Sequence, residues 1–152
     1  MIGLDIEVKN QYNNYLFKIF NGIEMSKYTW KIVYQDFIYS ENGEKKTNIF
    51  SKDVLNGDDF LKCISRNSYY MIFCGIEVYP IGKEITDIKI FEDFIDSSCQ
   101  MFFLCTDSGY IEFYCKDQNI LDLVYNNCVG DEFEKVEYKT YDELLGRNIG
   151  DW

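Results

Sequence analysis

Residues 99–115 read CQMFFLCTDSGYIEFYC and predict a β-hairpin. Two largely apolar runs flank Asp107-Ser108-Gly109, and a three-residue loop with glycine in the left-handed position is a common hairpin connection. In that register Thr106 faces Tyr110, and one face of the hairpin is wholly apolar. That face carries Met101, Phe103, Cys105, Ile111, Phe113 and Cys115. A two-residue loop would mix charged side chains into this set, so the clean segregation favours the three-residue loop.

The opposite face of the hairpin has a mixed composition. It carries Gln100, Phe102, Leu104, Thr106, Tyr110, Glu112, Tyr114 and Lys116. We expect Tyr110, Glu112 and Tyr114 to be exposed on this face and to form a contact surface, because polar positions of a half-buried strand face solvent.

The hairpin holds three of the six cysteines, and the spacing of all six argues against a metal or redox site. They lie at positions 63, 74, 99, 105, 115 and 128, with no C-x-x-C pair of the kind that zinc and redox motifs use. Cys115 is diagonal to Cys99 at about 7–8 Å in the expected register. A disulfide needs a Cβ separation of about 3.5–4.5 Å, so we expect these cysteines to pack in the core.

The composition indicates one soluble α+β domain spanning residues 1–152. The chain is 47% apolar and 18% aromatic, with no alanine, and its apolar residues are those that favour strands. A chain of this length buries enough surface to fold without a disulfide or a metal. No signal peptide is apparent, and the longest uncharged apolar runs span about ten residues, half the length of a membrane helix. We therefore expect a cytoplasmic location.

Hydrophobic periodicity and turn residues predict the remaining elements. Strands are predicted at 2–8, 28–34, 36–40, 69–79 and 133–138, and helices at 10–21, 56–66, 88–98 and 118–127, with one helical turn at 141–145. Glu41-Asn42-Gly43-Glu44 predicts a tight turn. Strands that neighbour one another along the chain predict a mainly antiparallel sheet with three or four helices packed on it. The strand order does not follow from this pattern.

The absence of histidine excludes most familiar catalytic arrangements. It removes Ser–His and Cys–His dyads, histidine-ligated zinc and the commonest general base at neutral pH. No dinucleotide, phosphate-loop or calcium-loop motif occurs. We therefore predict no catalytic residue, no cofactor and no metal ligand.

The net charge of −11 indicates the kind of partner that the chain can attract. Nucleic acid and anionic membranes would be repelled, whereas association with a basic protein would be accelerated. Aromatic side chains lie among the carboxylates near the C-terminus and suit such a contact. The candidate contact residues are Tyr110, Glu112, Tyr114, Glu134, Glu137, Tyr138, Tyr141, Asp142, Glu143 and Trp152. The same residues also suit an edge strand whose aromatic side chains pack on the core.

Several aromatic motifs resemble those of a small family from spore-forming and related Gram-positive bacteria. They are Ser26-Lys27-Tyr28-Thr29-Trp30, Tyr69-Tyr70-Met71-Ile72-Phe73, Asp107-Ser108-Gly109-Tyr110, Tyr114-Cys115-Lys116-Asp117 and the terminal Trp152. The family is known only as a domain of unknown function. The resemblance covers nearly the whole chain and implies a single intracellular domain. It implies no catalytic residues, because the family has no established activity.

Three hypotheses of function remain open. The first is a non-enzymatic bacterial binding protein that docks a basic partner, in its sharpest form an immunity or inhibitor protein that neutralises a basic toxin or nuclease. The second is an enzyme or ligand-binding domain that uses carboxylates and tyrosines in a cleft. The third is a structural protein that forms oligomers through its aromatic surface. The oligomeric state itself does not follow from the sequence.

Overall fold

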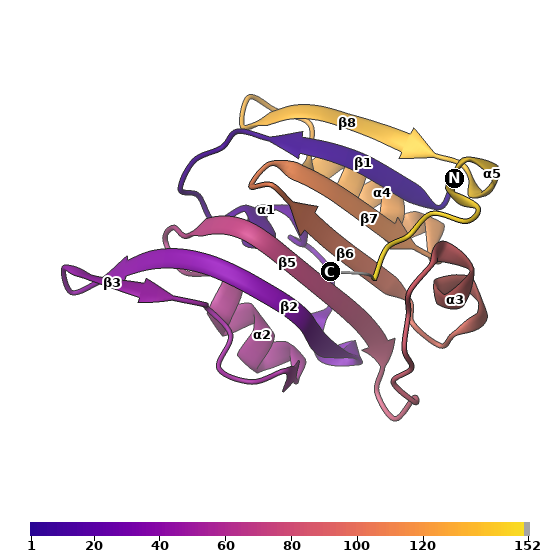
Figure 1. Cartoon of the computed structure of the whole chain (residues 1–152), viewed down its shortest axis with the longest axis horizontal. Coiled ribbons are helices and arrows are strands. Elements are labelled where there is room, and N and C mark those ends of the chain that lie inside the picture. The colour runs from indigo at the N-terminus through magenta and orange to yellow at the C-terminus, as the bar shows by residue number, and fades with distance from the viewer. Residues whose placement is uncertain (151–152) are drawn as a thin grey trace.

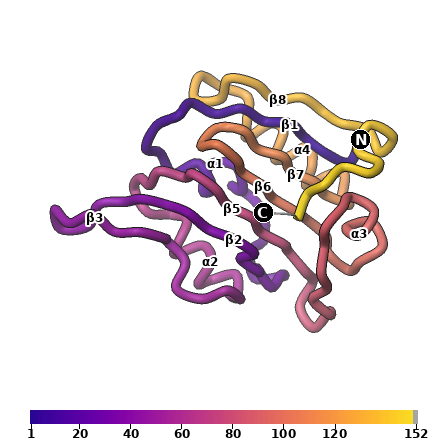
Figure 2. Tube along the Cα trace, in the orientation of Figure 1, coloured from indigo at the N-terminus to yellow at the C-terminus, as the bar shows by residue number. Residues whose placement is uncertain are grey.

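The computed structural model describes residues 1–150, in which eight strands form one antiparallel sheet. The strands are β1 (Gly3–Val8), β2 (Tyr28–Glu41), β3 (Glu44–Thr47), β4 (Val54–Leu55), β5 (Tyr70–Pro80), β6 (Met101–Thr106), β7 (Tyr110–Cys115) and β8 (Phe133–Lys139). Their order is β3-β2-β5-β6-β7-β1-β8, and β4 pairs with β2. The first strand thus lies between β7 and the last strand (Figure 2).

Helices cover both faces of this sheet (Figure 1). They are α1 (Tyr15–Ile19), α2 (Gly57–Ile64), α3 (Phe91–Asp96), α4 (Gln118–Asn127) and α5 (Tyr141–Leu144), with a short 3-10 helix, η1 (Met25–Lys27). Helices α1, α2 and α4 lie behind the sheet in Figure 1, whereas α3 and residues 145–150 lie in front of it. The predicted α+β class with a mainly antiparallel sheet is confirmed. Within residues 1–150, no helix has both the length and the apolar character of a membrane span.

The larger core lies between the sheet and helices α1, α2 and α4. Trp30 is fully buried at its centre and stacks on Phe60, with ring centroids 4.0 Å apart. The indole nitrogen of Trp30 donates a hydrogen bond to the carbonyl oxygen of Met25, so its polar atom is satisfied. The apolar face of the hairpin, including Cys105 and Cys115, packs into this core as predicted.

A second core lies on the other face of the sheet, beneath α3 and the segment 145–150, which we call the C-terminal strap. Tyr114 is fully buried there, and its ring lies 5.6 Å from that of Phe91 and 6.2 Å from that of Phe102. The prediction that Tyr114 is exposed is therefore wrong. The error has a physical reason: segments distant in sequence cover this half of the face. Cys99 is buried in this second core.

The hairpin β6–β7 has the predicted register, with Met101 opposite Cys115 and Thr106 opposite Tyr110. The loop conformation differs from the prediction, because Asp107 and Ser108 occupy the left-handed region and Gly109 does not. Gly109 is instead approached closely by β1, since a Cβ atom there would lie 3.1 Å from the carbonyl oxygen of Val8.

Three other predicted elements, one helix and two strands, differ in extent. The helix predicted at 10–21 is shortened to α1, because Asn13 forms an antiparallel bridge with Tyr69 and keeps the chain extended. The strands predicted at 28–34 and 36–40 are one strand, β2. Register shifts next to Ile32 and Phe37 allow both of these side chains to face the larger core.

Gly57 provides a test of the packing between α2 and η1. A Cβ atom at this position would lie 2.2 Å from the carbonyl carbon and oxygen of Met25. We expect Gly57→Ala to lower the free energy of unfolding by about 3 kcal/mol, because backbone atoms must move to admit the methyl group. Asp58→Ala, on the next residue, should cost only about 0.3–1 kcal/mol through the helix dipole. Urea unfolding measures both values, and equal losses would contradict the packing.

Candidate functional site

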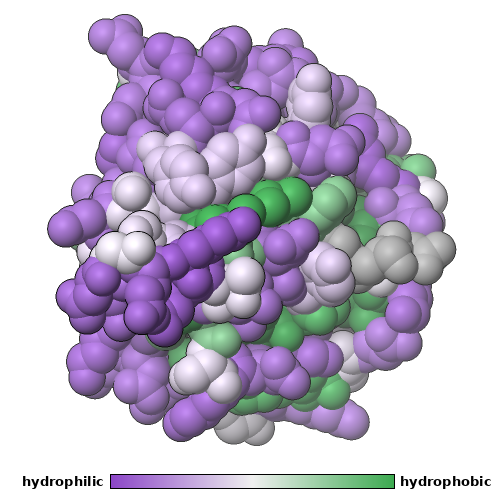
Figure 3. Space-filling view, turned by 60° about the vertical axis from the view of Figure 1, so that its left-hand side comes forward, coloured by the Kyte–Doolittle hydropathy of each residue, from purple (hydrophilic) through white to green (hydrophobic). Residues whose placement is uncertain are grey.

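The candidate site lies on the face of the sheet that carries the second core, which we call the second face. Here β7, β1 and β8 run side by side, and no helix in residues 1–150 covers them. Their registers align polar side chains in rows across the three strands: Asp5 is opposite Glu112 and Glu137, and Glu7 is opposite Tyr110 and Lys135. We call the surface formed by Asp5, Glu7, Asp107, Tyr110, Glu112, Glu134 and Glu137 the carboxylate patch. In Figure 3 the upper part of the molecule, where β1 and β8 lie, is largely hydrophilic, and apolar surface appears lower down.

Tyr110 is at the centre of the patch, with 57% of its surface exposed. It separates two hollows, and Glu7 lines both of them. One hollow has a volume of 290 Å³ and also includes Asp107 and Glu134; we call it the acidic hollow. The other, of 180 Å³, includes Asp5, Glu112 and Arg147, and we call it the arginine hollow.

Two carboxylates of the arginine hollow, Asp5 and Glu112, are already neutralised by cations. The Arg147 guanidinium donates to Glu112 and forms an ion pair with Asp5 at 3.4 Å. Glu112 also accepts a hydrogen bond of 2.7 Å from the hydroxyl of Tyr114, and Lys139 lies 3.4 Å from Asp5. Arg147 belongs to the C-terminal strap. This hollow therefore acts as an anchor that attaches the strap to the sheet.

The carboxylates of the acidic hollow have no such partners. Within residues 1–150, the side chains of Glu7, Asp107 and Glu134 form no hydrogen bond or ion pair. Asp107 projects from the β6–β7 loop, which is held in place by a hydrogen bond from the Ser108 amide to the Ile72 carbonyl. Three carboxylates and an exposed tyrosine ring thus face solvent together at one end of the sheet. Their chemistry suits a cationic group such as a lysine or arginine side chain.

The structure brings together four of the sequence-predicted contact residues in the carboxylate patch. Tyr110, Glu112, Glu134 and Glu137 belong to the patch. Tyr114 is buried in the second core, and the remaining ones are Tyr138, Tyr141, Asp142, Glu143 and Trp152.

Most of these other residues have structural contacts of their own. Tyr138 faces α4, where it stacks on Tyr125 and donates to Asp122; burial and this carboxylate raise the pKa of Tyr138 to about 12. The ring of Tyr141 contacts Phe91. Glu143 caps α5, and hydrogen bonds from Thr140 lower its pKa.

Asp142 and Trp152 complete the set of predicted contact residues. Asp142 is exposed in the first turn of α5, where its charge suits the positive end of the helix. Trp152 lies outside the described residues.

Sequence reasoning missed Asp5, Glu7, Asp107 and Arg147. The alternation in IGLDIEV did place Asp5 and Glu7 on the polar side of β1. Their role depends on β1 pairing with β7, which are separated by about a hundred residues in the sequence, and no local pattern reveals that pairing.

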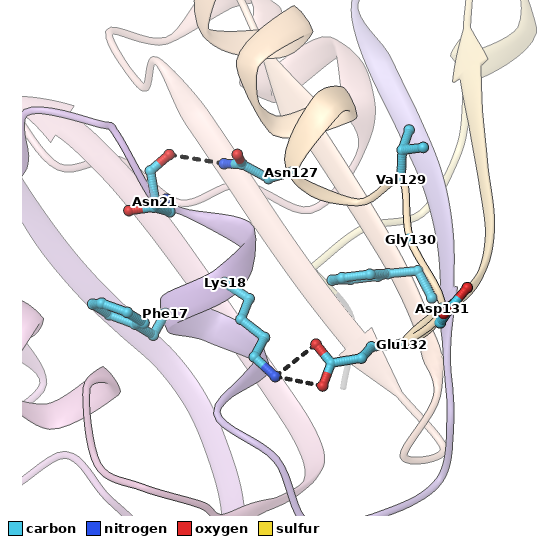
Figure 4. A pocket seen from close by; sticks show the side chains of 9 residues that line it. Phe17, Lys18, Asn21, Asn127, Val129, Gly130, Asp131 and Glu132 are labelled. Carbon is cyan, nitrogen blue, oxygen red and sulfur yellow. Dashed lines mark hydrogen bonds and ion pairs between the residues drawn. The ribbon is translucent and has the colours of Figure 1, made fainter.

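A further hollow, of 310 Å³, lies between α1 and the loop that joins α4 to β8 (Figure 4). Lys18 and Glu132 reach toward each other across it and form an ion pair of 2.6 Å. Asn127 donates to the carbonyl oxygen of Asn21 at 2.8 Å. Hydrogen bonds from Lys18 and Asn13 lower the pKa of Glu132. These paired groups join two elements and leave few polar atoms free for a ligand.

The buried carboxylate Glu77 belongs to neither hollow of the patch. It is 2% exposed, accepts a hydrogen bond of 2.6 Å from Tyr79, and its pKa is raised by burial. An enzyme that relied on this carboxylate would need a route from solvent to it. The hypothesis of a carboxylate- and tyrosine-based enzyme stays a prediction.

The cysteines have the environment of core residues. Cys99, Cys105, Cys115 and Cys128 are buried, and burial raises the pKa of each thiol to about 12. Cys74 is buried opposite Cys105, and burial raises its pKa as well. In residues 1–150, no group of three or more cysteines and carboxylates has a geometry that could hold a metal ion.

Comparison with known proteins places the chain in a family. Residues 1–149 match the family described as "Protein of unknown function (DUF2691)". The chain belongs to this family. It is also similar to "Uncharacterized protein YncE" of Bacillus subtilis (strain 168), with 29% identity over 139 residues that cover 91% of each chain. No solved structure gives a significant match. The predicted resemblance to a bacterial family of unknown function is confirmed.

Arg147 provides a test of the strap anchor in this DUF2691 protein. We expect Arg147→Met to lower the free energy of unfolding by about 2 kcal/mol, because the half-buried Glu112 loses its cation and Asp5 keeps only Lys139. The difference in the free energy of unfolding between the variant and the wild type should shrink in about 1 M salt, which screens the repulsion between Asp5 and Glu112. Limited proteolysis should also cleave the strap faster.

Lys89→Met is the matched control, because Lys89 pairs only with the exposed Asp87. It should cost about 0–0.5 kcal/mol. Urea unfolding would contradict the anchor if the two variants lost the same stability.

Thiol labelling tests the assignment of the cysteines to the core. In the native protein, Ellman's reagent at pH 8 should react first with the half-buried Cys63, since the five others are buried and stay protonated at this pH. All six should react after unfolding. Labelling of Cys105 or Cys115 in the native protein at the rate seen in the unfolded chain would contradict their burial.

Proposed function

We propose that this DUF2691 protein is a non-enzymatic binding protein that docks a basic segment of a partner protein at the carboxylate patch. The observation that carries the proposal is the acidic hollow, in which the unpaired carboxylates of Glu7, Asp107 and Glu134 surround the exposed ring of Tyr110. A tyrosine between carboxylates offers apolar contact area together with partners for cations, a combination typical of protein interfaces.

The charge of the whole chain supports the same partner class. A net charge of −11 accelerates association with a basic protein and disfavours nucleic acid and anionic membranes. Six cysteines without a disulfide in the described part suit a reducing compartment, so we propose the bacterial cytoplasm as the location. An immunity or inhibitor protein that neutralises a basic toxin or nuclease is the sharpest form of this proposal.

A titration with an arginine-rich peptide tests the patch directly. We expect hexa-arginine to shift the amide NMR signals of Glu7, Asp107, Tyr110 and Glu134 more than those of other acidic segments. Hexa-glutamate should leave them unchanged. The double variant Glu7→Gln, Glu134→Gln should weaken binding about fivefold to tenfold, because two charge contacts are lost. Added salt should also lower the affinity of the wild-type protein for hexa-arginine.

The matched control is Glu84→Gln together with Asp96→Asn. It makes the same change in net charge at two exposed positions outside the carboxylate patch. The control should bind the peptide as the wild type does. Shifts spread evenly over all acidic segments, or equal weakening in both double variants, would show that only the net charge acts and would sink the proposed docking site.

A further inference from the structure

Strand β8 forms an open edge of the sheet. It pairs with β1 on one side, and within residues 1–150 no strand pairs with its other side. In Figure 1 it forms the upper border of the sheet, opposite the border at β3. An edge strand presents backbone N–H and C=O groups that can pair with another chain.

The hydrogen bonds of β1 show which groups of β8 face outward. The Val8 amide donates to the Gly109 carbonyl at 2.9 Å, and the Cys115 amide donates to the Ile2 carbonyl at 3.0 Å. Within β1 the even-numbered residues therefore bond to β7, whereas the amide of Ile2, just before the strand, donates to the Lys139 carbonyl of β8 at 3.0 Å. Because bonding alternates between neighbours in an antiparallel sheet, Asp5 and Glu7 bond to β8.

It follows that the residues of β8 opposite them, Glu137 and Lys135, direct their backbone groups inward. The backbone groups of Val136 and Tyr138 point outward from the sheet.

The side chains on either side of Val136 in β8 carry opposite charges. Lys135 and Glu137 flank Val136 and share the second face of the sheet with Asp5 and Glu7. They are 39% and 51% exposed and lie 3.5 Å apart. The sequence of the edge is therefore self-complementary about Val136.

We propose that β8 pairs in antiparallel fashion with β8 of a second copy of this chain, with the twofold axis at Val136. In this register the outward N–H and C=O groups of the two Val136 residues bond to each other. Lys135 faces the partner's Glu137, and Glu137 faces the partner's Lys135, so the four charges alternate in sign around the axis. Directly opposite charges stabilise a pair of strands.

The same charges exclude the neighbouring registers. A shift that keeps outward groups opposite outward groups moves the axis to Lys135 or to Glu137. The first register places two lysines face to face, and the second places two glutamates face to face, together with Lys135 against the partner's Lys139. Like charges directly opposite each other are destabilising. Charged edges commonly prevent strand pairing, whereas here the order of signs permits the Val136 register and disfavours the two registers next to it.

The pairing can be tested apart from the proposed docking function, because it uses the backbone edge of β8 and the side chains of Lys135 and Glu137, which do not line the acidic hollow. It predicts a concentration-dependent dimer with twice the chain mass of 18.1 kDa, measured by sedimentation velocity and light scattering. Val136→Pro should abolish the dimer, because proline removes the outward N–H that the axis requires. The monomer should keep its fold, since this N–H does not bond to β1.

Charge variants test the register. Lys135→Glu alone and Glu137→Lys alone should each weaken self-association about tenfold or more, since each replaces attraction by repulsion around the axis. An equimolar mixture of the two single variants should restore a dimer, because each carboxylate of one variant then faces a lysine of the other. The double variant Lys135→Glu, Glu137→Lys should also dimerise like the wild type. Circular dichroism checks that each variant is folded.

Several outcomes would overturn the proposal. One is a wild-type chain that remains monomeric at the highest soluble concentration. Another is a chain in which the backbone amides of β8 are protected from hydrogen exchange only when a basic peptide is added. A dimer that survives Val136→Pro must use another surface. Failure of the mixed single variants to associate would reject the Val136 register. None of these results depends on binding of hexa-arginine at the carboxylate patch.

Discussion

The β6–β7 hairpin is apolar on both faces along most of its length, and this constraint organises the rest of the chain. Phe103 and Phe113 face one layer of helices, whereas Phe102 and Tyr114 face the opposite side. A strand with two apolar faces is stable only when both are removed from water, since each buried aromatic side chain contributes about 1.5–3 kcal/mol. The first face is covered by α1, α2 and α4. The second is covered by α3 and by the C-terminal strap.

The strap covers only part of this face of the sheet, and the candidate site lies on the part that the strap leaves uncovered. Its backbone pairs with the segment before α3, where the amides of Ile149 and Gly150 both donate to the carbonyl of Lys89. Its side chain Arg147 ends on Asp5 and Glu112. Beyond this ion pair, no helix in residues 1–150 covers β1, β7 and β8 on this face of the sheet, and the side chains there are mostly polar. The paired carboxylates are thus structural, and the unpaired ones around Tyr110 are available for a partner.

The two proposed interactions use adjoining parts of the same end of the sheet and share Glu137. The carboxylate patch offers charged side chains and a tyrosine ring, so its affinity depends on salt and on the charge of the partner. The edge of β8 offers backbone hydrogen bonds, and its side-chain charges determine the register rather than most of the affinity. A dimer joined at β8 would present two patches, one on each copy, and would allow bivalent binding of a partner with two basic segments.

Local sequence determined the identity of most elements and the register of the hairpin, because side-chain alternation and turn residues act over a few positions. The pattern of Met101, Phe103, Ile111 and Phe113 sufficed for the hairpin, and burial of its cysteines followed from that register. Asn42 and Gly43, both with positive φ, form the tight turn that their dipeptide predicts. Only tertiary structure decided that β1 lies between β7 and β8, since no local interaction encodes pairing across the length of the chain. That placement made neighbours of Glu7, Tyr110 and Glu134. The docking of residues 145–150, far in sequence from the hairpin, buried Tyr114 and gave Glu112 its cation.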